Sequence, residues 1–176
     1  FPRSNDCAYF LIAADYTSNL VLVQPVDAQT TDVVIAMLQT IFSIFGKPHT
    51  IVADNGAPLN NGFLDDFTKR AHIKMKHSSA YHPRGNSKAE RSVQLVKTIL
   101  KHITPNMTAW DTHVYWAAEI VNNTKMMYGY SPREIAFGRK SHKFADNIAA
   151  ILRKVLIDGT FADHLDREEN VHLAML

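Results

Sequence analysis

Apolar residues along this chain recur in two patterns, short continuous runs and a helical period. Runs of four to eight apolar residues bounded by turn formers are typical of buried strands, whereas apolar residues recurring three and four positions apart indicate helices. The first two runs, separated by the turn residues 16–19, predict a hairpin. We expect strands over 8–15, 20–26, 50–53 and 72–77, and helices over 28–45, 63–71, 87–103 and 109–127.

The boundaries of these elements follow from the residues that flank them. Gly46 and Pro48 should end the first long helix, and Thr108 should cap the helix that begins at residue 109. The segment 129–132 reads as a turn that opens a short helix ending near Gly138. Two strands, a helix, a strand, a helix, a strand and then helices predict a mixed sheet flanked by helices. Residues 141–176 read as a polar, partly helical tail or linker.

Composition supports one folded domain. The chain has 176 residues, of which 46% are hydrophobic, enough to bury a sizeable core. No stretch approaches the ~18 apolar residues of a membrane span, so we expect no membrane partner. The single Cys7 excludes an internal disulfide and fits a reducing compartment, and the nine histidines form no zinc-binding spacing with it.

Positive charge is concentrated in one segment. From Lys69 to Lys101 there are nine Lys or Arg residues and one acid, Glu90. The whole chain has 19 basic and 17 acidic residues, so the remainder carries ten and sixteen, a net charge of −6. A basic segment around one acid suggests a polyanion-binding surface with a cation-binding point inside it, although such a segment alone would more often be a solvated helix.

Two acids stand in distinctive local settings. Asp54 follows the short apolar run Ile51–Ala53 and precedes the turn dipeptide Asn55–Gly56, where glycine would tolerate a left-handed backbone. Taken alone, this is also an ordinary Asp-Asn-Gly turn. Glu90 lies 36 positions later, early in a helix that follows a loop rich in turn formers. A strand-end carboxylate and a helix carboxylate are what a two-metal phosphoryl-transfer site requires.

The helix that carries Glu90 has two distinct faces. Gln94, Lys97 and Lys101 follow Glu90 at spacings of four, three and four residues, on the same side of the helix. A separate apolar stripe can pack on the sheet. One face can therefore present a metal ligand followed by amide and basic groups for a DNA backbone, although solvated lysines would look the same.

In order and spacing these motifs resemble the catalytic core of retroviral and gypsy-type retrotransposon integrases. The motifs that carry the resemblance are Asp54-Asn55-Gly56, Tyr81-His82-Pro83, Glu90-Arg91, Tyr130-Ser131-Pro132 and Phe137-Gly138-Arg139. The resemblance covers about residues 1–140 and implies a ribonuclease-H-like fold. It also implies Asp54 and Glu90 as catalytic ligands of Mg²⁺ or Mn²⁺, and DNA contacts from the loop and the helix, by Tyr81, Asn86, Lys88, Arg91, Gln94 and Lys97. Ser87 departs from the glycine that usually follows the family's loop amide.

The third acid of the family lies on a first strand, which the resemblance places before Phe1. Asp15 matches an acid at the end of the second strand, so we do not expect it to substitute. The resemblance implies an integrase core that processes element DNA ends and joins them to target DNA, as a homo-oligomer, in the nucleus and cytoplasm of a host cell. The alternative is an inactive, integrase-derived domain that binds DNA or a protein.

Overall fold

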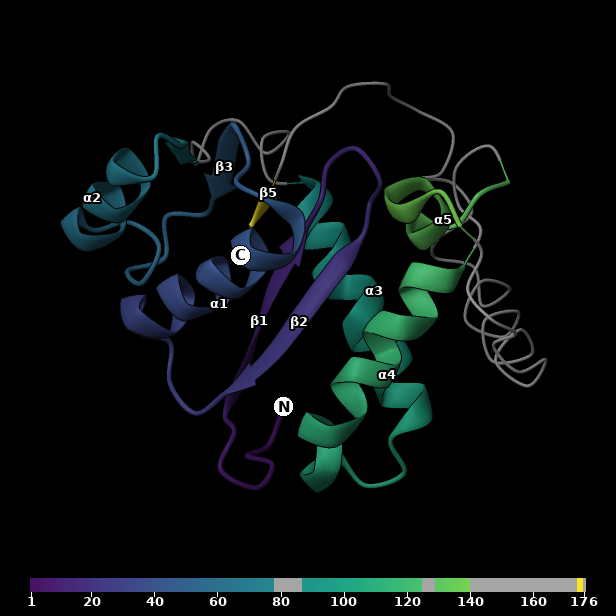
Figure 1. The fold of residues 1–176 in the computed structure, drawn as a ribbon. Coiled ribbons are helices and arrows are strands. Elements are labelled where there is room, and N and C mark those ends of the chain that lie inside the picture. The colour runs from purple at the N-terminus through teal and green to yellow at the C-terminus, as the bar shows by residue number, and fades with distance from the viewer. Residues whose placement is uncertain (78–86, 125–128, 140–173, 176) are drawn as a thin grey trace.

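A computed structural model of the chain describes residues 1–77, 87–124, 129–139 and 174–175. Strands and helices alternate through the first half, and helices follow, as the apolar pattern predicts (Figure 1). The elements are β1 Tyr9–Ala14, β2 Val21–Val26, α1 Thr31–Phe45, β3 Thr50–Ala53, α2 Gly62–Arg70, β4 Lys74–His77, α3 Ser87–Ile103, the 3₁₀ turn Met107–Ala109, α4 Trp110–Asn123, α5 Pro132–Phe137 and β5 Ala174–Met175.

The strands form one mixed sheet in the order β2-β1-β5-β3-β4. β1 and β2 make the predicted antiparallel hairpin, in register from Tyr9 opposite Val26 to Ala14 opposite Val21. β3 and β4 are parallel neighbours. The two-residue strand β5 runs antiparallel to β1 and parallel to β3, so β1 and β3 point in opposite directions.

Helices cover both faces of this sheet, which confirms the predicted ribonuclease-H-like architecture. Alternate residues of β1 serve two separate cores. Leu11 and Ala13 pack with α1 and α2, whereas Ile12 and Ala14 pack with α3 and α4. In Figure 1 the helices α1 and α2 lie on one side of the β1–β2 hairpin and the helices α3 and α4 on the other. Within the described residues, none of the helices has the length and apolar character needed to cross a membrane.

Most boundaries agree with the expectations within a few residues, and two differ for a physical reason. α1 begins at Thr31 because the side chain of Thr30 accepts a hydrogen bond from the Val33 amide and caps it. The predicted Thr108 cap is wrong: the side chain of Asn106 accepts from the Thr108 amide and opens a 3₁₀ turn that leads into α4. Gly46 ends α1 with a φ of 82°, as predicted.

Only two residues of the predicted polar, partly helical tail are described, and they form a short strand. Ala174 and Met175 form β5, inserted between β1 and β3. Residues 140–173 lie outside the described residues, so the remainder of the tail stays a prediction. The predicted end of α4 at residue 127 is wrong: the helix ends at Asn123, because Thr124 has an extended backbone, with φ −79° and ψ 128°.

The N-terminal residues are fastened to the start of α4. The indole Nε1 of Trp110 donates to the carbonyl oxygen of Pro2 at 2.7 Å. The hydroxyl of the buried Ser4 lies 2.5 Å from Asp111 Oδ1, and the amide of Asn5 donates to both carboxylate oxygens of Asp111. These hydrogen bonds, first that from Ser4 and then that from Asn5, hold the pKa of Asp111 below its usual range.

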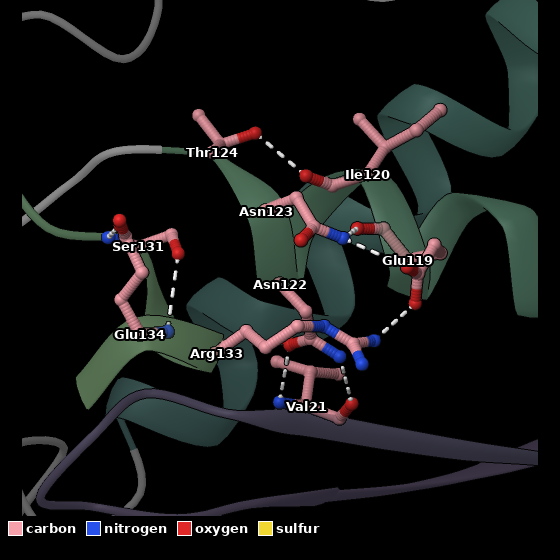
Figure 2. A network of polar contacts seen from close by, with 9 residues as sticks. All are labelled: Val21, Glu119, Ile120, Asn122, Asn123, Thr124, Ser131, Arg133 and Glu134. Carbon is pink, nitrogen blue, oxygen red and sulfur yellow. Dashed lines mark hydrogen bonds and ion pairs between the residues drawn. The ribbon is translucent and has the colours of Figure 1, made fainter. Parts of the chain in front are cut away.

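A polar network at the other end of α4 joins it to β2 and α5 (Figure 2). The buried side-chain amide of Asn122 accepts from the Val21 amide at 2.8 Å and donates to the Val21 carbonyl at 2.7 Å. Arg133 forms an ion pair with Glu119, which ties α5 to α4. Ser131 and Glu134 form a reciprocal capping box at the start of α5, so the segment 129–132 opens a helix as expected.

Candidate active site

Asp54 stands directly after the last residue of β3, as the sequence indicated. Its Oδ1 accepts a hydrogen bond of 2.8 Å from the Gly56 amide. A Cβ atom at position 56 would lie 2.9 Å from the same oxygen. Gly56 is not among the described residues with a positive φ, so the expected reason for this glycine is wrong. It is required because the Asp54 carboxylate folds back against its backbone.

A cavity of about 380 Å³ opens beside Asp54, between β1 and the turn after β3. Leu11 and Val34 line it from the core under α1, and Ile12 and Val93 from the core under α3. The cavity therefore passes through the plane of the sheet. β5 pairs only with Ala13 and Ala14 of β1, so within the described chain residues 9–12 have no strand partner on this side. The cavity is a slot in the middle of the sheet.

Glu90 lies in the first turn of α3, and its neighbours place it relative to this slot. Ala89, beside it, is buried against Val52, two residues before Asp54. Val93 and Lys97 lie three and seven positions after Glu90, on the same side of the helix, and both line the slot together with Asp54. Glu90 is exposed and lies one turn before Val93, but it is not among the residues that line the slot.

Asp15 is placed differently. Its carboxylate accepts from the amide and the hydroxyl of Ser18, at 2.8 and 2.5 Å, and so closes the turn between β1 and β2. It follows Ala14 of β1, which lies level with Val52 of β3 across Ala174, and because the two strands are antiparallel, Asp15 and Asp54 extend from that level in opposite directions. Within the described residues, no group of three or more His, Cys, Asp or Glu side chains could hold a metal ion.

The predicted DNA-contact residues fall into three sets. Arg91, Gln94 and Lys97 are exposed on α3, whereas Tyr81 and Asn86 lie outside the described residues. Lys88 is half-buried: its ammonium donates to the Tyr16 carbonyl and lies 4.3 Å from the centre of the Tyr16 ring. Burial, and next the nearby Arg91, lower the pKa of Lys88, against the opposing effect of Asp15.

Sequence reasoning missed two features of the site. The partner of Lys88 lies 72 residues away in the sequence, and no local pattern connects them. The close approach of Gly56 to Asp54 had a signal, because an acid two residues before a glycine at a strand end is a typical Asx turn. The roles of Asp54 and Glu90 as metal ligands, and the DNA contacts, stay predictions.

Several sequence relatives of the chain are retroviral or retrotransposon Pol polyproteins. An uncharacterised protein of Caenorhabditis elegans is 32% identical over 141 residues, 77% of this chain and 11% of that protein. The retrovirus-related Pol polyprotein from transposon 412 of Drosophila melanogaster is 28% identical over 146 residues, 80% of this chain and 12% of that protein. The chain thus spans about an eighth or less of the curated relatives it matches. No protein-family model matches it.

Solved structures with a similar fold are retroviral integrase catalytic cores. The HTLV-2 core in complex with magnesium, in its dimeric form, has a TM-score of 0.59 and 24% identity, over 72% of this chain and 83% of that chain. The BIV core has a TM-score of 0.63 and 18% identity, over 73% and 85% of the two chains. The chain is therefore related to the Pol polyproteins of retroviruses and LTR retrotransposons, and it has the fold of a retroviral integrase catalytic core.

Proposed function

We propose that this domain is the core of a retroelement integrase, a polynucleotidyl transferase that processes element DNA ends and joins them to target DNA. The observation that supports the proposal is that Asp54, at a strand end, lines the slot together with Val93 and Lys97 of α3, the helix whose first turn carries Glu90. The HTLV-2 neighbour, which is described as a magnesium complex, supports the same reading.

The donor set suits a divalent cation. Carboxylate oxygens are the ligands that Mg²⁺ and Mn²⁺ prefer, and Asp54 and Glu90 would supply them. Bound ions would activate the attacking oxygen and stabilise the leaving oxygen of the phosphoryl transfer. The Gly56 amide holds Asp54 Oδ1 in place, which reduces the reorganisation that binding requires. Lys97, which lines the same slot, places positive charge where a phosphate would enter.

The slot suggests where a third carboxylate would come from. A strand lying beside residues 9–12 of β1 would fill the gap and end near Asp54, because β1 begins at that end of the sheet. Phe1 also lines the slot and packs against Phe10 and Trp110, at the end where such a strand would join the chain. We propose that a strand joined to Phe1 in a longer polyprotein carries the missing acid.

A direct test compares residues 1–176 with a chain extended upstream in the same element. We expect no end processing or strand transfer with Mg²⁺ from the short chain, and both activities from the extended one. Removing one metal-binding carboxylate costs orders of magnitude in rate, so Asp54→Asn or Glu90→Gln should abolish them, whereas Asp15→Asn should not. Activity of the short chain that is lost on Asp15→Asn would contradict the assignment.

One observation favours a second candidate, an inactive integrase-derived domain that binds DNA or a protein. The described residues contain no complete three-carboxylate group. If the extended chain still binds duplex DNA with steep salt dependence but stays inactive, the binding role is correct and the catalytic role is wrong.

Assembly and location complete the proposal. The HTLV-2 integrase cores are described as dimeric and trimeric, and a further neighbour is an intasome of simian T-cell lymphotropic virus. We propose that this domain also self-associates, with DNA as its partner, in the nucleus and cytoplasm of a host cell. Sedimentation of the purified chain at several concentrations measures its self-association.

A further inference from the structure

The edge strand β4 carries two exposed lysines on one face of the sheet. Lys74 and Lys76 alternate with Met75, which packs into the core under α1 and α2. Because successive side chains of a strand point to opposite faces, both lysines point to the other face, the one that α3 covers. Positions 74 and 76 are about 7 Å apart along the strand, a spacing that allows both ammonium groups to contact one polyanion.

The register places these lysines beside the candidate active site. Lys76 is paired with Val52 of β3, and paired residues of parallel strands point to the same face. Val52 in turn is buried against Ala89, the residue before Glu90. Lys76 therefore lies one strand away from the first turn of α3, on the same face. β4 is the edge of the sheet, so the surface continues outward from the site across this strand.

The local charge leaves both lysines available to a phosphate. Among the described residues, neither lysine forms an ion pair with an acid. The acid near β4, Asp65, lies 3.9 Å from the ring of His77, which alternates with Lys76 and so points to the opposite face. Lysines also protect exposed sheet edges from pairing with other strands, and that role alone would explain their presence on β4. The position of both lysines beside α3 favours DNA binding, because protection of the edge alone would not require them on that face.

We propose that Lys74 and Lys76 bind the phosphate backbone of DNA and extend the α3 surface across β3 to the edge of the sheet. This inference rests on the proposed function and adds a binding surface to it. Contacts of this kind position a nucleic acid without reading its sequence. Both side chains are exposed, so replacing them should leave the fold intact.

The experiment measures affinity for a labelled duplex of random sequence as a function of salt, for the wild-type chain and three variants. Each phosphate neutralised contributes about 0.9 to the slope of log affinity against log salt. We expect Lys74→Gln with Lys76→Gln to lower that slope by about 1.8 at two contacts. The arginine double variant at the same positions should keep the wild-type slope. Arg3→Gln with Arg139→Gln removes the same charge from exposed positions elsewhere and should change the slope far less.

The outcomes separate this inference from the function on which it rests. If the two glutamine variants have equal slopes, the β4 surface does not bind DNA, whereas the integrase assignment stands. If the Lys74→Gln, Lys76→Gln chain keeps its affinity but self-associates in light scattering, the lysines only protect the edge and the inference is wrong. If the wild-type chain does not bind the duplex or binds it independently of salt, both the inference and the proposed function fail.

Discussion

The side chain of Asn122 makes the hydrogen bonds to the edge strand β2 that a neighbouring strand would otherwise make. Its side-chain amide makes one accepted and one donated hydrogen bond to the backbone of Val21, at 2.8 and 2.7 Å, and both groups are buried (Figure 2). β2 is the edge of the sheet, so the outward backbone groups of Val21 have no strand to pair with. We predict that Asn122→Ala destabilises the domain more than other polar truncations on α4.

The magnitude follows from the two bonds. A buried backbone group that loses its partner costs about 1–3 kcal/mol, so two such groups give about 2–6 kcal/mol. Water that enters beside the edge strand would form hydrogen bonds to the two exposed backbone groups and recover part of the lost free energy. We therefore expect Asn122→Ala to lower the free energy of unfolding by about 2–3 kcal/mol. For a domain of this size that corresponds to a fall in Tm of about 4–12 °C.

Urea unfolding followed by circular dichroism measures the change. Asn123→Ala is the matched control, because Asn123 is the next residue of the same helix and, within the described residues, its amide donates to Glu119 of α4. We expect that control to cost about 1 kcal/mol or less, the value of an ordinary hydrogen bond of a half-buried side chain. The reasoning is refuted if the two variants are equally stable, or if Asn122→Leu, which fills the space without hydrogen bonds, unfolds at the wild-type urea concentration.

Two further predictions concern Asp54 and Asp111. Gly56→Ala should weaken Mn²⁺ binding, measured by calorimetry, because its Cβ would lie 2.9 Å from Asp54 Oδ1 and displace the carboxylate. Gly62→Ala is the control, because its Cβ would meet nothing within 4 Å, and it should leave Mn²⁺ binding unchanged. Equal effects of the two substitutions would contradict the argument. Hydrogen bonds, the one from Ser4 first, hold the pKa of Asp111 below its usual range. The ionised Asp111 carboxylate therefore stabilises the folded state at neutral pH, and this stabilisation is lost as the pH falls below about 4. Acid unfolding should therefore be less steep in Asp111→Asn, and an unchanged acid profile would contradict this.

Local patterns predicted the elements well, since most of them rest on signals contained in a few residues. The apolar period of α1 and α3, the hairpin of β1 and β2 and the turn that opens α5 all depend on neighbours within one or two turns. The cap at Thr108 failed because Asn106 offered a competing cap two residues earlier. β5 could not be foreseen: it is two residues long, and its partners lie more than 100 residues away in the sequence.

The candidate site was predictable to a similar degree. Asp54 and Glu90 were predicted from a strand-end turn and a helix start, and Asp54 lines one slot together with Val93 and Lys97 of the helix that carries Glu90. The slot itself could not be predicted from the sequence, because it forms where residues 9–12 of β1 and the strand β3 are not joined by a strand between them. The same holds for the contact between Lys88 and Tyr16: the resemblance implies Lys88 only as a DNA contact, whereas the fold places its ammonium 4.3 Å from the centre of the Tyr16 ring.

The slot also bears on how this domain would aggregate. Protein sheets usually recruit other chains at their edges, but here both edges are guarded: Asn122 occupies the start of β2, Pro25 within β2 has no amide to donate, and β4 presents lysines. Within the described residues, the backbone groups of β1 that lack a strand partner lie instead at the centre of the sheet. At high concentration we therefore expect these molecules to associate when a strand of one molecule enters the slot beside β1 of another. A peptide that occupies the slot should prevent this association.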